Sequence, residues 1–445
     1  MNQIAIGDSS AWTVVDGYSI APPCRSAALF LSFSSETFLQ EKIDIQLAGT
    51  PAQISTALGT LEKIKLRAQA YARGEYAHPQ LIRFQPTSAA AYYYAHISNI
   101  FFESNPNGYL THQTGSLLIT LHYTRPAYFD GDQLELPLTG RAGTDVTGGL
   151  AILNHTDGHA AHGNSVLIKA ASALTDMPAP LRFELTNTYS TTLLKDIFVG
   201  AYHHPTVTAE NIFFAHANSM SGGTQYTNPA AINEYYRTVS WTSSAWTELL
   251  NYGISLTDIN LLDGRTFRPI LHFYTPHAYT DLSLRLSLKR GIYTIQVCEP
   301  VYTDPNFQYV IFPPIQLPPN QLLRETLPHH VEIQVSGLKE DGSLASFSMD
   351  QLLLLPLDYG ALYSGFFLMD QDDILIDDAF RGLLNVRYSA AGSETISHIR
   401  QGGPLRLYPN ENTRLIFVLA NSSNVIDIDR TATIRVYYRP RVRFL

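Results

Sequence analysis

Three histidines and an aspartate lie within eight positions of the chain, a set of residue types that could bind a metal ion. The stretch reads ILNHTDGHAAHGNS over 152–165 and contains His155, Asp157, His159 and His162. Histidines spaced by four and three positions share one face of a helix, where imidazoles can ligate zinc.

The same stretch also contains residues that oppose a helix. Gly158 and Gly163 interrupt the helical spacing, and Asn154 favours a turn. The zinc protease pattern needs a glutamate directly after the first histidine, where this chain has Thr156. We therefore predict a polar loop with no metal or cofactor, and an ion held by the loop is the alternative.

A second candidate for metal binding is the acidic run MDQDDILIDD over 369–378. It begins like a calcium loop at Asp370, but the sixth position is Leu375 where a glycine is required. The twelfth position is Arg381 where a glutamate is required. The run is more typical of an apolar strand with solvated acidic ends.

Sequence signatures of common enzymes are missing from the chain. It has no nucleophile elbow, no phosphate-binding P-loop, no HExxH and no dinucleotide-binding glycine pattern. We expect no enzyme activity, and a glycan hydrolase is the minority alternative.

Aromatic residues cluster in YYRTVSWTSSAW, where Tyr235 and Tyr236 precede Trp241 and Trp246. Such side chains could form a platform on which a sugar ring stacks. More often they are core residues or anchors of a protein interface. Both interpretations remain open from the sequence.

The C-terminal residues alternate arginine with other types. Arg439, Arg441 and Arg443 would lie on one side of an extended strand. They could bind carboxylates of a neighbouring subunit, or they could keep an exposed edge strand solvated.

The composition excludes several classes of protein. A net charge of −9 opposes general nucleic-acid binding. Cys24 and Cys298 are the two cysteines and are far apart, so we expect two buried free thiols. The N-terminal residues do not resemble a signal peptide, and the apolar run at 352–357 is too short to insert into a membrane.

One amphipathic helix is expected over 51–73. Thr50 can cap it, with Gln53 completing a capping box, and Gly74 can end it. Apolar residues recur at spacings of three and four along this segment, which predicts one buried face.

The rest of the chain is typical of β-strands. With 26 Tyr and 21 Phe, it contains many short alternating or apolar runs, such as 27–34, separated by turn residues. We predict a mainly β protein with three segments: a β-sandwich with one packed helix over 1–135, a jelly-roll sandwich over 140–358, and a small C-terminal β unit or arm over 359–445.

Several phrases resemble the distal tail proteins, which are tail-tip structural proteins of long-tailed bacteriophages and prophages. They include GTPAQISTALGTLEKIKLRAQAYA, LLITLHYTRPAYFDGD, the segment from ELPLTGRAG to HAAHGNSVLI, WTELLNYGISLTDINLLDGRTFRPIL and the terminal TATIRVYYRPR. The resemblance implies a tail-tube-like first domain that forms a homo-oligomeric, hexameric ring. It also implies an outward galectin-like or carbohydrate-module-like sandwich, and a structural role for the histidine loop.

The hypothesis that follows is a ring-forming hub or adaptor in the virion, at the tail tip or baseplate, made in the host bacterial cytoplasm. Its partners would be the tail tube, the tape-measure protein, a tail fibre or hub, and a host-surface glycan. The alternatives are a carbohydrate-binding host-adhesion module and a capsid-decorating virion protein.

Overall fold

The computed structural model of the chain divides into two compact units. Unit 1 is Met1–Leu134 with Thr175–Ala179 and Arg439–Leu445, and unit 2 is Glu135–Leu174 with Pro180–Tyr438. The structure describes residues 3–8, 11–14, 38–76, 79–85, 91–97, 99–104, 116–154, 163–172, 175–206, 211–255, 258, 262, 264–318, 331–357, 359–363, 368–380, 383–390, 393–396, 400–403 and 405–442. The strand expected at 27–34 lies outside these residues.

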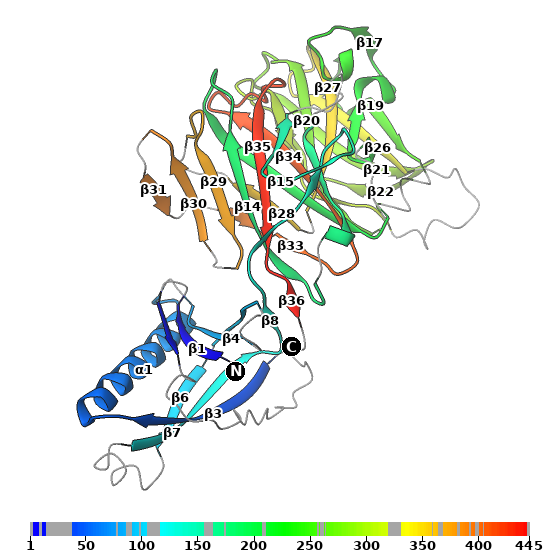
Figure 1. Cartoon of the computed structure of the whole chain (residues 1–445). Coiled ribbons are helices and arrows are strands. Elements are labelled where there is room, and N and C mark those ends of the chain that lie inside the picture. Colours follow the sequence, from blue (N-terminus) through cyan, green and yellow to red (C-terminus); the bar gives the residue numbers. More distant parts are fainter. Residues whose placement is uncertain are drawn as a thin grey trace. The chain divides into compact units, whose positions relative to one another are not determined.

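In its described residues, unit 1 consists of two antiparallel sheets and one helix, α1 (Pro51–Ala72), which lies alongside the strands in Figure 1. Its core contains side chains from the helix and from both sheets. Sheet A has the order β2 (Ala11–Val14), β1 (Gln3–Asp8), β4 (Leu81–Gln85), β5 (Tyr93–His96), β8 (Phe129–Asp130) and β36 (Arg441–Val442). Sheet B has the order β3 (Phe38–Ala48), β7 (Ser116–Pro126) and β6 (Asn99–Ser104).

The helix α1 forms as its sequence predicts. The amide of Gln53 donates to Thr50 Oγ1 at 3.3 Å, and the amide of Thr50 donates to Gln53 Oε1 at 2.9 Å, which completes the capping box. Gly74 follows the helix with φ of +75°, a conformation that glycine adopts without strain. The buried face consists of Ile54, Leu61, Ile64 and Ala68.

Unit 2 contains an outer β-sandwich made of two facing sheets. Phe183 on one sheet packs edge-on against Tyr363 on the other, with ring centroids 5.4 Å apart. Sheet C has the order β12 (Leu150–Leu153), β35 (Thr431–Tyr438), β14 (Ala179–Asn187), β29 (Ile374–Asp378), β30 (Leu383–Tyr388) and β31 (Ser393–Ile396), and β33 (Arg406–Leu407) also pairs with β14. Sheet D has the order β11 (Asp145–Val146), β10 (Leu138–Thr139), β13 (Ser165–Ile168), β34 (Asn412–Asn421), β15 (Leu194–His204), β28 (Tyr359–Tyr363) and β32 (Arg400–Gly402).

The strand order of this sandwich is that of a jelly roll. Taken in chain order, its eight main strands are β12, β13, β14, β15, β28, β29, β34 and β35. Sheet C then has the order first, eighth, third, sixth, and sheet D has the order second, seventh, fourth, fifth. This alternation between two sheets defines the jelly roll, so the predicted fold class is confirmed.

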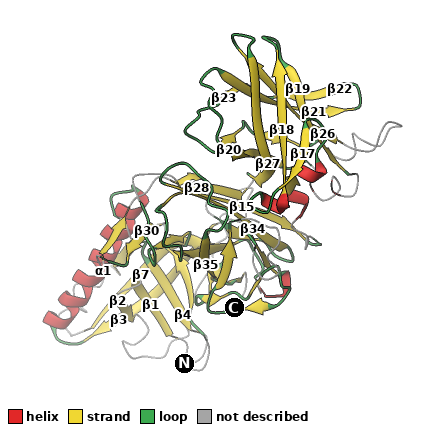
Figure 2. Ribbon diagram, turned by 90° about the horizontal axis from the view of Figure 1, so that it is seen from above, coloured by secondary structure: helices red, strands yellow, loops and turns green. Residues whose placement is uncertain are grey.

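A second sandwich is inserted between β15 and β28, the fourth and fifth strands of the outer jelly roll. Figure 2 shows its strands gathered apart from β34 and β35. Sheet E has the order β17 (Thr224–Thr227), β18 (Tyr235–Thr242), β27 (Leu344–Pro356), β20 (Thr266–Thr275) and β24 (Tyr309–Ile311), with β16 (Phe214–His216) on β27 and β25 (Ile315–Gln316) on β20. Sheet F has the order β19 (Thr247–Ile254), β26 (Val331–Lys339), β21 (Leu282–Arg290) and β22 (Tyr293–Val297), with β23 (Val301–Tyr302) on β21.

The inserted sandwich repeats the topology of the outer one. Its eight main strands in chain order are β18, β19, β20, β21, β22, β24, β26 and β27. Sheet E has the order first, eighth, third, sixth, and sheet F has the order second, seventh, fourth, fifth. Unit 2 is therefore one jelly roll nested inside another of the same topology. Short 3-10 turns connect some of the strands: η1 (Ala170–Ser172), η2 (Asn211–Phe213), η3 (Ala217–Ser219) and η4 (Ile232–Glu234).

The two jelly rolls share packing across β15. Phe198 and Tyr202 on this strand belong to the same buried cluster as core residues of the inner roll. Gly200, between them in the strand, lies against β27, where an added Cβ would be 2.7 Å from Pro356 Cδ. Sheet D is thus covered on both faces, by sheet C and by sheet E.

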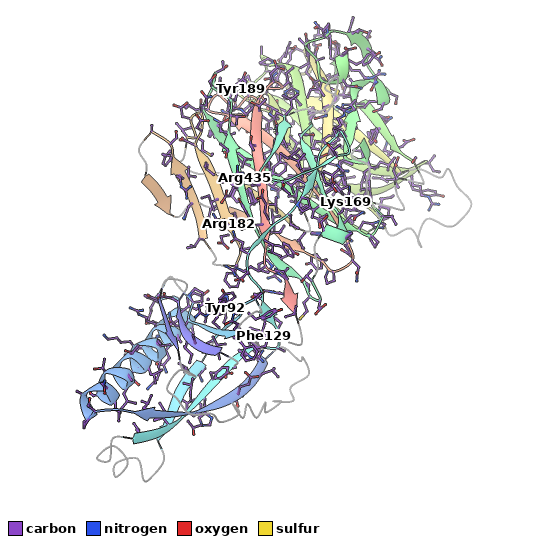
Figure 3. The ribbon with its side chains drawn as sticks, viewed as in Figure 1. Tyr92, Phe129, Lys169, Arg182, Tyr189 and Arg435 are labelled. Carbon is purple, nitrogen blue, oxygen red and sulfur yellow. The ribbon has the colours of Figure 1, made fainter. Side chains whose placement is uncertain are left out.

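The outer face of sheet C is polar. Along β14, Phe183 is buried, whereas Arg182 and Glu184 are partly exposed and form an ion pair. Glu184 lies opposite the exposed Arg435 on β35, and Figure 3 labels Arg182 and Arg435 in this sheet. This alternation is typical of a strand with one buried and one solvated face.

The nesting changes the expected segments 140–358 and 359–445. The first segment holds half of the outer roll and all of the inner roll, and the second supplies the remaining strands of the outer roll. Residues 359–438 are therefore part of unit 2 and not a separate C-terminal unit. Alternation along a strand reports which face is buried but not which distant strand lies beside it.

Candidate functional site

A pocket of about 450 Å³ opens in unit 2 where the outer roll meets the inner roll. We call it the β15–β24 pocket, because residues from the start of β15, from β23 and the following loop, and from β24 form its walls. It is lined by Lys195, Asp196, Phe198, Val301, Tyr302, Asp304, Phe307, Tyr309, Val310 and Ile311.

Aromatic rings at right angles form the apolar walls of this pocket. Tyr309 meets Phe198 at an interplanar angle of 82° and Phe307 at 86°, with centroid distances of 6.1 and 5.6 Å. Tyr302 is 68% exposed, so it lies toward solvent, and its hydroxyl donates to Glu340. The pocket therefore combines buried and accessible ring surface.

Carboxylates dominate the polar part of the lining. Asp196 is only 7% exposed, and within the part of the chain that the structure describes its Oδ1 atom accepts no hydrogen bond. Its Oδ2 atom is 3.9 Å from the ammonium of Lys195, which itself donates to Asn424 at 2.9 Å. Asp304 Oδ1 accepts from the backbone amide of Asn306. Burial, and then the charge of Asp196, raise the pKa of the Tyr309 phenol.

Sequence analysis did not identify this pocket. Lys195 and Asp196 lie at the start of the buried strand β15, and Asp304 and Phe307 lie in a loop more than a hundred positions later. Neither segment has a motif, and only the insertion of the inner roll brings them together. The one signal that the two segments share is an acidic residue close to aromatic residues.

The aromatic residues predicted from sequence do not form one platform. Trp241 is 6% exposed and lies in the core of the inner roll against Phe347, so it is a core residue. Trp246 is partly exposed, and the guanidinium of Arg285 lies 4.3 Å from its ring centroid. Tyr235 packs against the core.

Tyr236 belongs to a different arrangement, a ladder of stacked tyrosines on sheet E. Its ring stacks on Tyr226 at 5.2 Å and on Tyr274 at 4.2 Å. Tyr226 is 46% exposed. This tyrosine ladder is the accessible aromatic surface of the segment that the sequence singled out.

The C-terminal arginines that the structure describes bind groups of their own unit. Arg441 Nε donates to Asp130 Oδ1 at 2.6 Å, and Arg439 donates to the carbonyl of Gly131. Burial raises the pKa of Asp130, and Arg441 opposes this shift. Arg443 lies outside the described residues. A contact of these arginines with another subunit stays a prediction.

The candidate metal loop, with His155, His159 and His162, lies outside the described residues. Within the described part of the chain, no group of three or more potential ligands is placed to hold a metal ion. Cys298 is a free, buried cysteine as expected, whereas Cys24 is outside the described residues. No helix in the described part is long and apolar enough to cross a membrane.

The acidic run forms a strand as expected, and Asp370 and Asp372 at its start are exposed, but the other acidic residues are not solvated. Asp373, Asp377 and Asp378 are each less than 5% exposed. Asp377 accepts a hydrogen bond from Tyr363 at 2.7 Å, and Asp373 accepts one from the amide of Ser389. These carboxylates can be buried because donors inside the sandwich form hydrogen bonds with them. The periodicity of a strand does not reveal such donors.

No protein-family model and no curated protein matches the chain. Among solved structures it is similar to two chains of the phage p2 baseplate in its activated conformation. For the baseplate structure with Sr, the TM-score is 0.23 and the identity is 8%, and the match covers 44% of this chain and 72% of that chain. For the structure with Ca, the TM-score is 0.24 and the identity is 8%, and the match covers 100% of both chains. A chain of the infectious bursal disease virus VP2 subviral particle has a TM-score of 0.18 at 9% identity over 69% of this chain and 78% of that one. TM-scores this low establish no shared fold and assign no function.

Proposed function

We propose that this chain is a structural, non-enzymatic component of a phage or phage-like tail. In this proposal unit 1 assembles with copies of itself into a ring that joins the tail tube at the tip of the virion. The resemblance implies six copies. Unit 2 faces the other tail proteins as an adaptor. The neighbouring proteins would be the tail tube, the tape-measure protein, and a fibre or hub.

The observation that carries the proposal is the construction of sheet B in unit 1. Within the described residues, β3 and β6 are its two edges and both lie antiparallel to the central β7. An unpaired edge is a template for pairing with another chain. Because β3 and β6 run in the same direction, β3 of one copy can pair with β6 of the next.

Such pairing is heterologous, since two different edges meet. A heterologous contact generates a ring when its rotation closes and an open filament when it does not. Each added copy covers two edges, so a closed ring leaves neither edge of sheet B exposed. This geometry supports the ring that the sequence resemblance implies.

An exposed aromatic residue marks the β6 edge as a contact surface. Phe101 is 48% exposed and stacks on His122 with ring centroids 4.5 Å apart. Aromatic side chains supply large contact area in protein interfaces. Phe101 is therefore the residue at which assembly can be weakened without disturbing the core of unit 1.

The test is assembly of the Phe101→Glu variant, measured by analytical ultracentrifugation of the full chain. We expect the wild type to sediment as a discrete oligomer and Phe101→Glu to shift toward monomer. Leu344→Glu is the matched control, because Leu344 is 62% exposed but belongs to unit 2. Equal sedimentation of wild type and Phe101→Glu would contradict the role of the β6 edge.

The tyrosine ladder supports a second candidate function, binding of a host-surface glycan by the inner roll. Sugar rings present C–H faces that pack against exposed aromatic rings. Glycan-array binding by the full chain should be lost in Tyr226→Ala and retained in Trp241→Phe, which changes only the core. Binding that survives Tyr226→Ala would rule out the ladder as the glycan site.

A further inference from the structure

A strip of exposed apolar side chains follows one edge of the inner roll. It consists of five residues in and around β22, the edge strand of sheet F, and in β23: Ile292, Tyr293, Ile295, Val297 and Tyr302. We call it the β22 strip, and Figure 2 shows β22 at the end of its sheet, beside β21. Ile292 is 89% exposed and Tyr302 is 68% exposed. Exposed apolar residues that gather in one place, rather than lying singly, mark a contact surface.

The β22 strip is long enough for a specific contact. Tyr293 near one end lies opposite Arg290 of β21, and Tyr302 at the other end lies opposite Ser283 of the same strand. These two positions of β21 are seven residues apart, so the strip is about 23 Å long at ~3.3 Å per residue. Two strips of this length would together bury on the order of 1,000 Å², the size of a weak, reversible protein contact.

The strip offers side chains rather than a backbone edge. Ile295 has no partner on β21, because the register shifts there between Leu288 and Lys289. A bulge of this kind on an edge strand hinders the addition of a further strand. The strand is nevertheless held in place, since Gln296 Nε2 donates to the carbonyl of Pro314 at 3.2 Å. A surface that is already fixed loses little entropy on binding.

The two ends of the strip carry opposite charge. Residues 291–298 contain no charged side chain, whereas Arg290 precedes them and Glu299 follows them. Glu299 is exposed and Arg290 is partly exposed. At the acidic end Glu340 is also exposed, and it accepts a hydrogen bond from the Tyr302 hydroxyl at 3.1 Å. The apolar strip therefore runs from a basic end to an acidic end.

This charge pattern is complementary to itself. When two copies face each other about a two-fold axis, their strips run antiparallel, so the basic end of each meets the acidic end of the other. The apolar side chains then meet in the centre and leave water. An anionic membrane surface would attract the basic end but repel the acidic end. The pattern favours a second copy of the chain as the occupant.

We propose that the β22 strip is a self-association surface, through which the inner rolls of two copies bind each other about a two-fold axis. Arg290 of each copy lies near Glu299 of the other. The contact differs from the edges of sheet B in unit 1, and it does not rest on the proposed ring.

The test is sedimentation velocity of the full-length Phe101→Glu variant at micromolar concentration, where the proposed ring contact is weakened. We expect a reversible equilibrium of monomer and dimer. Adding Val297→Lys should weaken the dimer by about tenfold or more, because an ammonium is placed in an apolar contact. Leu344→Lys is the matched control, because Leu344 is 62% exposed but lies in sheet E, and it should leave the dimer unchanged. Because the ring contact is weakened throughout, failure of this inference and failure of the ring give different results.

Exchanging the end charges in the same background tests the antiparallel arrangement. Arg290→Glu makes both ends of the strip acidic, and Glu299→Lys makes both ends basic. Each variant alone should dimerise a few-fold less, an effect that salt reduces. An equimolar mixture of the two should recover a mixed dimer, because every end then faces its opposite charge.

Several results would overturn the proposal. A dimer that survives Val297→Lys would lie elsewhere on the molecule, and a protein that stays monomeric at every micromolar concentration would not self-associate. A mixture that dimerises no better than its two components would contradict the antiparallel contact. Flotation of wild type with phosphatidylglycerol vesicles that is lost in Val297→Lys would identify a membrane contact instead. Should Val297→Lys fail to fold, as judged by circular dichroism, the mixture still decides the question.

Discussion

Glu41 and Arg125 form a bidentate ion pair inside unit 1. The two oxygens of Glu41 accept from Arg125 Nε at 2.8 Å and from Nη2 at 2.7 Å, and Tyr123 donates to Glu41 at 2.6 Å. Both charged side chains are less than 10% exposed. Burial and then the charge of Glu41 raise the pKa of Tyr123, so this phenol stays a donor. The pair fixes β3, one edge of the proposed ring contact, against the central strand β7.

Replacing Glu41 with glutamine should destabilise unit 1 by about 3–5 kcal/mol, because Arg125 is left as a buried, uncompensated charge. Urea unfolding of the full chain, followed by hydrogen exchange in β3 and β7, measures the loss. The exposed pair of Glu62 with Lys65 provides the control, since Glu62→Gln should change stability by no more than about 1 kcal/mol. A similar loss in both variants would show that burial of the pair is unimportant.

His203 in β15 makes the stability of unit 2 dependent on pH. It is 1% exposed, its Nδ1 atom shares a hydrogen bond with Thr413, and burial together with the charge of Arg265 lowers its pKa to about 3. An unfolded histidine takes up a proton near pH ~6.5. Below that pH the unfolded chain binds more protons than the folded one, so stability falls as the pH drops toward about 3.

The His203→Gln variant should lose this part of the pH dependence. For one proton, the slope is at most ~1.4 kcal/mol per pH unit. Urea midpoints of wild type and variant, compared at several pH values between the two pKa values, should converge as the pH falls. Parallel curves would mean that His203 is protonated in the folded state.

At the scale of elements, local signals were sufficient for α1 and for the existence of most strands. Thr50, Gln53 and Gly74 act within a few positions of each other, so their roles can be predicted from the sequence. The partners of β15 could not be predicted in this way. Its neighbours β34 and β28 come from residues 412–421 and 359–363, after the entire inner roll.

The packing of β15 against β27 leads to a prediction for Gly200. An alanine there would place its Cβ 2.7 Å from Pro356 Cδ and 3.0 Å from the Pro356 carbonyl oxygen. We expect a loss of about 1–3 kcal/mol from overpacking in Gly200→Ala. Gly59 on α1 has nothing within 4 Å of an added Cβ, so Gly59→Ala should stabilise. Thermal unfolding of both variants measures whether each substitution lowers or raises stability. Unchanged stability in Gly200→Ala would contradict the close contact between the two jelly rolls.

At the scale of the whole molecule, the nesting of the two jelly rolls explains both the success and the failure of sequence reasoning. Short alternating strands correctly predicted a mainly β chain containing a jelly roll. The same pattern occurs in the two halves of the outer roll and throughout the inner one, so it does not show where a roll is interrupted. The β15–β24 pocket exists because of that interruption, and no local motif identifies it.

The central claim is that identical copies of unit 1 assemble through the edges of sheet B. Mass photometry of the purified full chain tests it most directly, with negative-stain images of the same sample to show the shape. We predict a discrete species at a multiple of the 49.5 kDa chain mass, six by the resemblance, with a ring in projection. A strictly monomeric 49.5 kDa species at high concentration, with no ring in the images, would contradict the claim.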